Sequence, residues 1–316
     1  MHRLKNLVTR YVLRVKTQLY KTYVRLFGRI VFKDKFGLMY YLYSNTRISS
    51  TLVRNVRTDD EGVLNVIGEV ISDLRSKPDR TQPLVCFDVG AYMGIVSLFL
   101  SKQVGSEGTV YSFEPEPVTY QRLCHNIELN HSQNIRPNRA AMWHQAGLEL
   151  PLAHLPDDPG NGYLVDGNVE VEVDRKLDTV STIAIDTFMA AHKIDAIDLL
   201  KIDAEGKDGE IVQDAQEAIK QGKISYIIFE FIDMGACSLY LELRKLGFEI
   251  YWIETDGCSI EPLTADLIQK KSWGNCLAIS PEISLQTGKI STPDDHNSQS
   301  YDSRKDSHAY HRASSL

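Results

Sequence analysis

The chain has 316 residues, 43% of them hydrophobic, so it can bury one large core or two modest ones. Residues 1–35 hold ten Lys or Arg residues and one Asp, which gives a charge of +9. Because the net charge of the chain is −7, the other 281 residues together carry −16. An acidic body argues against nucleic acid as a partner, because binding to a phosphate backbone needs a cationic surface.

The cysteines and the apolar runs indicate the compartment. Five scattered cysteines without a CxxC pair are typical of reduced thiols, and not of a disulfide framework or a zinc site. No apolar run approaches the roughly 20 residues that span a bilayer. The N-terminus also lacks the apolar core and cleavage site of a secretory signal. We therefore expect a cytoplasmic protein, with any membrane contact being peripheral.

The first predicted element is an amphipathic helix over residues 3–31, within the basic segment 1–35. Apolar residues recur every three or four positions from Leu4 to Ile30, beside a stripe of arginines and lysines. Such a helix suits the surface of an anionic membrane. The same pattern fits a helix that packs on its own domain or on a second subunit. Peripheral membrane contact, internal packing and oligomer formation therefore all stay open.

A helical extension is predicted over 36–83, with its helix at 62–76, before a domain at 84–284 in which strands and helices alternate. This alternation indicates a mostly parallel sheet covered on both faces. Valines that alternate with acids at 169–173, a loop at 156–162 and an extended piece at 181–186 predict a β-hairpin insertion. The polar residues 285–316 predict a disordered tail. The predicted core strands are 84–89, 109–114, 135–142, 197–203, 224–231, 248–254 and 275–280, and the predicted helices are 94–103, 117–130, 207–221 and 236–246.

A glycine turn follows the first predicted core strand, in the run Phe87-Asp88-Val89-Gly90-Ala91-Tyr92-Met93-Gly94, and the next strand ends in Glu114. This arrangement predicts a nucleoside site in which the Glu114 carboxylate accepts the ribose hydroxyls. A nicotinamide-dependent reductase is disfavoured, because a pyrophosphate would be repelled by Asp88 and needs glycine at Tyr92.

S-adenosylmethionine carries positive charge and no phosphate, so it suits Asp88, while Gly90 and Gly94 let the backbone approach it. The structural alternative is a strand-to-helix turn with a capping acid.

Charged residues also follow two later apolar strands. Lys201, Asp203 and Glu205 lie at the end of the strand at 197–203, and Glu230 lies at the end of the strand at 224–231. Ligands of open α/β sheets bind at the carboxyl ends of the strands, so these residues are expected beside the nucleoside site. For Lys201 the alternative is an ion pair with Asp203 or Glu230.

Three runs together resemble the FkbM family of S-adenosylmethionine-dependent methyltransferases: residues 87–94; Phe113-Glu114-Pro115 with Asn126-Ile127-Glu128-Leu129-Asn130; and residues 199–206. The resemblance covers about 84–231, and more loosely extends to 281. It implies the Rossmann-like α/β class I methyltransferase fold, a seven-stranded mostly parallel sheet with one antiparallel strand, flanked by helices. It also implies O-methylation of a hydroxyl on a sugar, glycolipid or other secondary metabolite, and it does not name the acceptor.

One departure from the family concerns the adenine side of the cofactor site. Many members have a short polar run with an Asp after the third strand, where this chain has Ala140-Ala141-Met142-Trp143-His144-Gln145. We place Ala141 in the cofactor site. The adenine contact then falls to His144, to Gln145 or to a main-chain group.

An alcohol is a poor nucleophile, so methyl transfer to it needs a base. Asp203 is the first candidate, followed by Glu205, Glu230 and His144, and Lys201 is counted with the catalytic residues. A divalent metal on the three acids could acidify the hydroxyl instead. We do not favour this alternative, because the number of ligands is not established.

The expected acceptor is a small molecule or a lipid-linked glycan. The rival function is a catalytically inactive methyltransferase-fold scaffold at a membrane surface, which would have no physical need for a cluster of acids.

Overall fold

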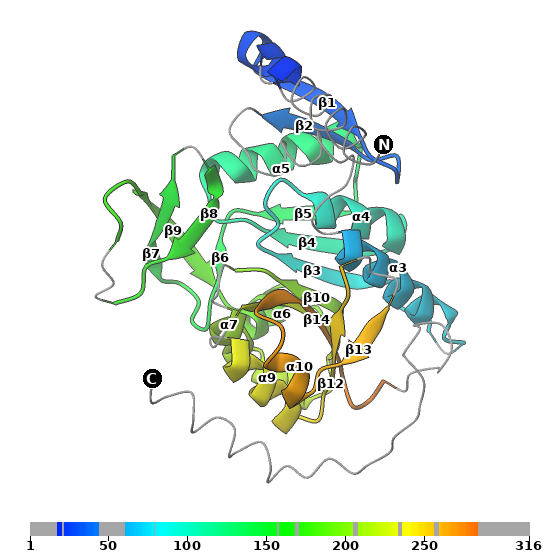
Figure 1. The fold of residues 1–316 in the computed structure, drawn as a ribbon. Coiled ribbons are helices and arrows are strands. Elements are labelled where there is room, and N and C mark those ends of the chain that lie inside the picture. The colour runs from blue at the N-terminus through cyan, green and yellow to red at the C-terminus, as the bar shows by residue number, and fades with distance from the viewer. Residues whose placement is uncertain are drawn as a thin grey trace, which may run out of the picture.

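The computed structural model describes residues 18–20, 22–43, 61–78, 80–156, 158–167, 171–204, 208–232, 236–255 and 259–283. Its centre is a sheet of eight strands with helices on both faces (Figure 1). The strand order is β13-β12-β14-β11-β10-β3-β4-β5. The strands are β3 (Val85–Val89), β4 (Thr109–Phe113), β5 (Ile135–Asn138), β10 (Ile197–Ile202), β11 (Ile224–Ile232), β12 (Glu249–Ile253), β13 (Ile260–Pro262) and β14 (Trp273–Ile279).

The direction of the strands identifies the fold class. β3, β4, β5, β10 and β11 are parallel neighbours, and β14 runs antiparallel between β11 and β12. This confirms the α/β class I methyltransferase sheet expected from the resemblance. The difference is β13, a strand of three residues that pairs antiparallel with β12 and adds an eighth strand at the edge.

The central strands are apolar on both sides because helices cover both faces of the sheet. Cys86 packs in a core cluster with helices α3 and α4, and its neighbour Phe87 packs in a second cluster with α6 to α9. Burying one large apolar side chain stabilises the fold by about 1.5–3 kcal/mol. The helices are α3 (Glu61–Ser76), α4 (Ile95–Val104), α5 (Pro117–Leu129), α6 (Ile185–His192), α7 (Asp208–Asp214), α8 (Gln216–Lys220), α9 (Ala236–Lys245) and α10 (Ala265–Ile268).

The helices α6 and α10 were not predicted from the sequence. The helix predicted at 207–221 is broken at Ala215 into α7 and α8. The helix predicted at 62–76 is confirmed by α3. Cys86 and Cys276 are buried free thiols and Cys124 is a half-buried one, whereas Cys237 and Cys258 have no described surroundings.

The helix predicted over 3–31 ends earlier than expected. Residues 18–20 and 22–27 are helical, and Gly28, with φ +81°, turns the chain into strand β1 (Arg29–Lys33). β1 pairs antiparallel with β2 (Met39–Tyr43), so the prediction of helix at 29–31 is wrong. Residues 1–17 and the predicted tail at 285–316 lie outside the described residues, and the division into domains stays a prediction.

Two asparagines attach this N-terminal hairpin to α5. Asn130 accepts the Met39 N–H at 2.8 Å, and Asn126 accepts the Tyr41 N–H at 2.8 Å through Oδ1. Asn126 also donates from Nδ2 to the Met93 carbonyl at 2.8 Å. One fully buried side chain therefore joins the hairpin to the glycine turn.

The segment predicted as a β-hairpin forms a larger structure, which we call the insertion sheet. Its strand order is β6-β9-β7-β8, and β6 leaves the predicted strand 135–142 to pair with β9. The loop predicted at 156–162 lies mostly in β8, because pairing with β7 overrides the low strand propensity of Gly160 and Gly162. Residues 171–175 are turn and irregular, and not strand as predicted. The strands are β6 (Ala141–Met142), β7 (Glu149–Leu155), β8 (Asp158–Leu164) and β9 (Lys176–Ile183).

Candidate functional site

A cavity of about 270 Å³ lies at the carboxyl ends of the core strands, and residues of β8 in the insertion sheet form part of its wall. Gly94 does not line it, and Glu205 lies outside the described residues. Eight of the predicted site residues line the cavity: Asp88, Gly90, Tyr92, Glu114, Ala141, Lys201, Asp203 and Glu230.

The glycine turn brings two strand ends into direct contact. Gly90 has φ +74°, and a Cβ there would lie 1.9 Å from the Asp203 carbonyl oxygen. The Asp203 N–H donates to the Val89 carbonyl at 3.1 Å, which continues the β3–β10 pairing into the turn. Gly90 is therefore required both by its left-handed backbone and by the close approach of β10.

Gly94 has a structural role, since it precedes α4 with φ +91° and packs against Leu123. Tyr92 has φ +51°, which is uncommon for a residue with a side chain. Its ring is covered by Gly160 of β8, where a Cβ would come within 1.8 Å of the ring. A side chain at position 160 would have to displace the Tyr92 ring, so the insertion sheet rests closely on the turn at this glycine.

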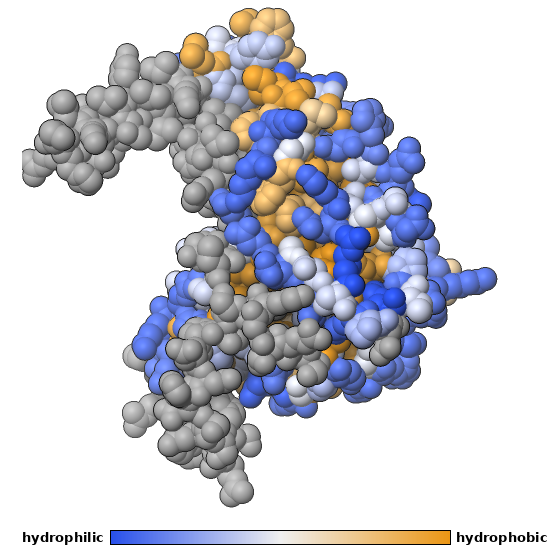
Figure 2. Space-filling view, turned by 90° about the vertical axis from the view of Figure 1, so that its right-hand side faces the viewer, coloured by the Kyte–Doolittle hydropathy of each residue, from blue (hydrophilic) through white to orange (hydrophobic). Residues whose placement is uncertain are grey.

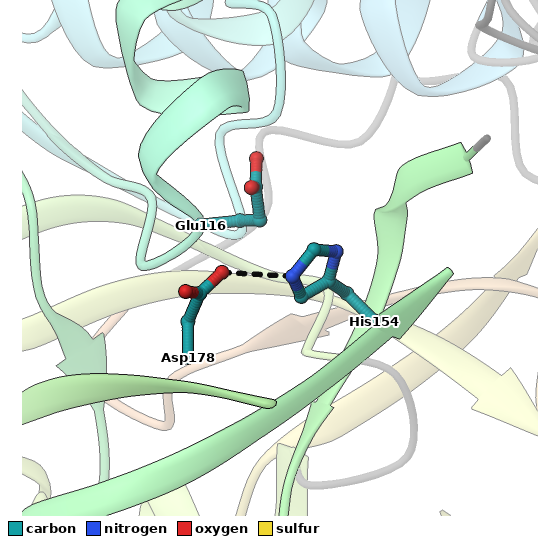
Figure 3. A group of neighbouring side chains, drawn as sticks. All are labelled: Glu116, His154 and Asp178. Carbon is teal, nitrogen blue, oxygen red and sulfur yellow. Dashed lines mark hydrogen bonds and ion pairs between the residues drawn. The ribbon is translucent and has the colours of Figure 1, made fainter. Parts of the chain in front are cut away.

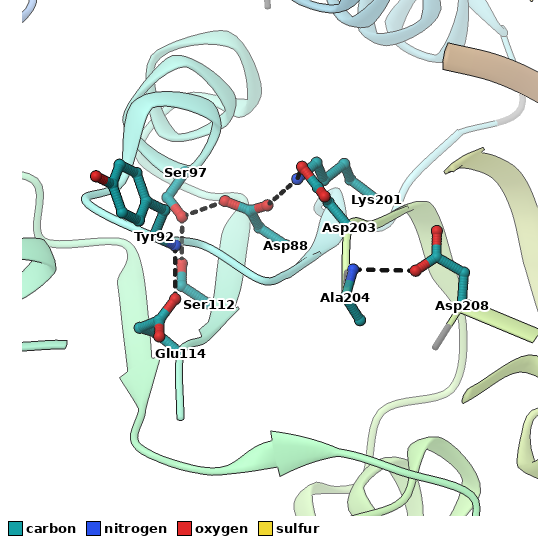
Figure 4. A network of polar contacts seen from close by, with 9 residues as sticks. All are labelled: Asp88, Tyr92, Ser97, Ser112, Glu114, Lys201, Asp203, Ala204 and Asp208. Carbon is teal, nitrogen blue, oxygen red and sulfur yellow. Dashed lines mark hydrogen bonds and ion pairs between the residues drawn. The ribbon is translucent and has the colours of Figure 1, made fainter. Parts of the chain in front are cut away.

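Glu114 is held in place by the backbone around it. Its Oε2 accepts the Tyr92 N–H at 2.9 Å (Figure 4), and its Oε1 accepts the Glu116 N–H at 2.9 Å. Burial raises the pKa of Glu114 to about 8, although the two backbone hydrogen bonds oppose the shift. Each oxygen keeps acceptor capacity, so the carboxylate can still receive two hydroxyl groups.

Asp88 is buried at the end of β3. Its Oδ2 accepts a hydrogen bond from Ser97 Oγ at 2.5 Å, and Ser97 is in turn bonded to Ser112 at 2.7 Å. Its Oδ1 has no hydrogen-bond partner among the described residues and lies 4.0 Å from Lys201 Nζ. Burial raises the pKa of Asp88, and the charge of Lys201 opposes this.

Lys201 forms the ion pair that the sequence left as an alternative. Its Nζ lies 3.0 Å from Asp203 Oδ2, so the buried ammonium stands between Asp88 and Asp203 (Figure 4). The Asp203 side chain is 36% exposed and lines the cavity, which makes it reachable by an acceptor. This geometry makes Lys201 a positioning residue for two carboxylates.

Asp208 is a residue that the sequence analysis missed. It is buried at the start of α7 and accepts the Ala204 N–H at 3.0 Å. Burial raises its pKa to about 7, helped by the negative charges of Asp203 and Glu230. The signal in the sequence was an acid six residues after the end of β10, at the beginning of a helix.

The far wall of the cavity is formed by β11 and β14. Glu230 accepts a hydrogen bond from Trp273 Nε1 at 2.5 Å, and Asn275 is its register partner on β14. Both partners line the cavity, and neither was predicted. The only signal for them in the sequence was the polar Asn275 near the start of the otherwise apolar strand β14.

His144 and Gln145 are exposed and do not line the cavity, which disfavours both as the adenine contact and His144 as a base. Ala140, Ala141 and Met142 line that side instead. Their main-chain groups fit the remaining alternative. Glu205 lies outside the described residues, so the metal alternative that includes it stays a prediction.

Known proteins similar to this chain are methyltransferases. Residues 88–250 match the Methyltransferase FkbM domain. Methyltransferase sdnD of Sordaria araneosa is 28% identical over an alignment of 156 residues, and the match covers 41% of this chain and 60% of that protein, less than two thirds of its length. Hexuronic acid methyltransferase AglP of Haloferax volcanii is 23% identical over an alignment of 197 residues, and the match covers 59% of this chain and 76% of that protein.

Among solved structures, methyltransferase FkbM from Methylobacillus flagellatus KT has 15% identity and a TM-score of 0.41, covering 73% of this chain and 60% of that one. A likeness at this level adds nothing to the fold assignment, which stands on the strand order.

Proposed function

Because the chain belongs to the FkbM methyltransferase family, we propose that it transfers a methyl group from S-adenosylmethionine to a hydroxyl of a sugar, glycolipid or other secondary metabolite. One observation carries the proposal. Strand-end acids of β3, β4, β10 and β11 meet around one cavity, and the Glu114 carboxylate is oriented there by two backbone N–H groups.

The residues present fit S-adenosylmethionine. Glu114 offers two oriented acceptors for vicinal ribose hydroxyls, and Asp88 Oδ1 is a buried acceptor without a hydrogen-bond partner among the described residues. Asp88 therefore suits the ammonium of the aminoacyl part, and the main chain of Ala141 suits the adenine edge. When bound, the sulfonium supplies an activated methyl carbon.

The protein's remaining task is to orient the acceptor and to remove its proton. Asp203 has one oxygen engaged by Lys201 and a side chain that reaches the cavity. We assign it as the base, with Lys201 fixing its orientation. Glu230, held by Trp273, orients the acceptor from the other side. Gly160 and Tyr163 of β8 line the same cavity as these reacting groups.

Calorimetry of the full chain with S-adenosylmethionine tests the cofactor assignment. We expect binding by the wild type and no measurable binding by Asp88→Ala or Glu114→Ala. Exposed Glu128→Ala is the matched control, because Glu128 lies on α5 away from the cavity wall. A wild type that does not bind would favour the inactive scaffold, and unchanged affinity in both site variants would reject the nucleoside assignment.

The acceptor class has its own support and its own test. AglP, by its name, methylates a hexuronic acid, which favours a sugar acceptor here. Mass spectrometry of extracts from cells with and without the protein should reveal a metabolite that loses 14 daltons, the mass of CH₂, when the protein is absent. A difference confined to amines or thiols would contradict O-methylation.

We also propose peripheral membrane contact through the N-terminal region, for an acceptor carried on a lipid. Leu19, Leu26 and Phe27 are 66–71% exposed, beside exposed Arg25, and the helical segment and β1 present an apolar area at the top of Figure 2. No helix within the described ranges is long and apolar enough to cross a bilayer.

Flotation with anionic vesicles tests this contact. Leu26→Asp combined with Phe27→Asp should abolish flotation, whereas Val173→Asp, at an exposed apolar position of the insertion, should not. Equal flotation of the two variants would contradict the proposal.

A further inference from the structure

Three side chains of metal-binding type meet beside the cofactor cavity and are not used by the proposed reaction. Glu116 precedes α5, His154 lies on β7 and Asp178 lies on β9 (Figure 3). One ligand atom from each lies within 4.8 Å of the other two. Figure 3 shows Asp178 and His154 in contact, with Glu116 on the neighbouring loop.

The register of the insertion sheet creates this cluster. Asp178 is paired with Leu152, which lines the cavity, and His154 lies two residues further along the same face of β7. Diagonal neighbours of this kind are within reach of each other, and His154 Nε2 lies 2.8 Å from Asp178 Oδ2. The sheet thereby presents an imidazole and a carboxylate to the start of α5.

Burial leaves two polar atoms of the cluster unsatisfied. Glu116 is 2% and His154 is 6% exposed. Glu116 Oε2 accepts the Thr119 N–H at 2.5 Å and caps α5, whereas Glu116 Oε1 and His154 Nδ1 have no hydrogen-bond partner among the described residues. An unpaired buried acceptor costs about 1–3 kcal/mol, so an atom of this kind indicates a missing partner.

We propose that Glu116, His154 and Asp178 bind a divalent transition-metal ion of the zinc type. One imidazole and two carboxylates are a normal ligand set for Zn²⁺ and leave one tetrahedral position for water. The imidazole disfavours Mg²⁺ and Ca²⁺, which prefer oxygen ligands. The Asp178 side chain is 44% exposed, which gives the ion an entry path.

The ion would fasten the insertion sheet to the loop that holds the cofactor. The Glu116 N–H donates to Glu114 Oε1 at 2.9 Å. The residue whose side chain would bind the metal therefore also holds the ribose-binding carboxylate through its backbone. Because the ion links the insertion sheet to the cofactor loop, binding of the metal should stabilise the fold and raise cofactor affinity, with Asp203 still supplying the base.

Titration of the chelator-treated full chain with ZnCl₂, followed by calorimetry, tests the proposal. We expect one site with at least a tenfold loss of affinity in His154→Gln and in Asp178→Asn. His125→Gln is the matched control, because His125 is exposed on the same helix that Glu116 caps. Zn²⁺ should raise the melting temperature of the wild type and of the control only, and MgCl₂ should not compete.

The chain has nine histidines, so adventitious binding of zinc is a defined outcome. Equal zinc affinity in the wild type, His154→Gln and Asp178→Asn would show binding elsewhere and would overturn the proposal. The absence of a one-to-one site in the wild type would also overturn it, and would make the cluster a hydrogen-bonded group that binds no ion. Asp178→Asn changes a partly exposed residue, so the test does not depend on His154→Gln folding.

Discussion

Gly90→Ala should be the most damaging single methyl addition in the cofactor turn. The new Cβ would lie 1.9 Å from the Asp203 carbonyl oxygen, whereas real Cβ atoms keep at least 3.0 Å, so the end of β10 must retreat by about 1 Å. This retreat breaks the hydrogen bond from the Asp203 N–H to the Val89 carbonyl, at about 1–3 kcal/mol if the groups stay buried. The left-handed φ of +74° adds about 1–2 kcal/mol. The expected loss of unfolding free energy is therefore about 2–5 kcal/mol.

Gly147→Ala isolates the contribution of the collision. Gly147 has a similar φ of +79° in a turn, and a Cβ there would meet nothing within 4 Å, so only the backbone strain of about 1–2 kcal/mol applies. Urea unfolding of both variants gives the difference, and calorimetry should show that only Gly90→Ala weakens cofactor binding. Equal stability loss in the two variants, with equal cofactor affinity, would refute the close-approach argument.

Three further predictions concern single side chains. The pKa of Glu114 is about 8, and ribose hydroxyls need its ionised form, so cofactor affinity should rise as the pH increases from 6 through 8 and then level off. Calorimetry across this range should show no such rise for Glu114→Gln, and a wild-type affinity that falls with pH would contradict the assignment. Asp203→Asn should keep cofactor affinity within about twofold and lose at least 100-fold in turnover, and near-normal turnover would remove it as the base. Asn126→Leu should cost about 2–4 kcal/mol in urea unfolding, because the Tyr41 N–H and the Met93 carbonyl both lose their partner, and a loss below about 1 kcal/mol would show that the link is not important.

The two asparagines illustrate how far a sequence motif can be interpreted before the fold is known. Asn126 and Asn130 were part of the family resemblance, but no spacing rule says what they bind. In the fold their side chains hydrogen-bond to backbone groups of β2, as a neighbouring strand would, and so attach β2 to α5. The first strand of the hairpin was missed because Ile30 continues the helical spacing of the apolar residues before it. In the structure, Gly28 ends the helix and changes the direction of the backbone.

Local sequence determined where the acids of the site lie. Four parallel core strands, β3, β4, β10 and β11, are apolar runs with an acid at or near the carboxyl end, and parallel strands bring these ends to one edge, so Asp88, Glu114, Asp203 and Glu230 could be placed around one cavity in advance. Gly90 was identified for the same reason, since the turn needs a backbone without Cβ.

Tertiary structure alone decided what covers that edge. The pairing of β7 with β9 joins residues more than 20 positions apart, and it brings His154 and Asp178 to Glu116. The contact of Gly160 with Tyr92 spans an even longer separation along the chain. Sequence periodicity reports which face of a strand is apolar, but it contains no information about which distant strand or loop will pack against that face.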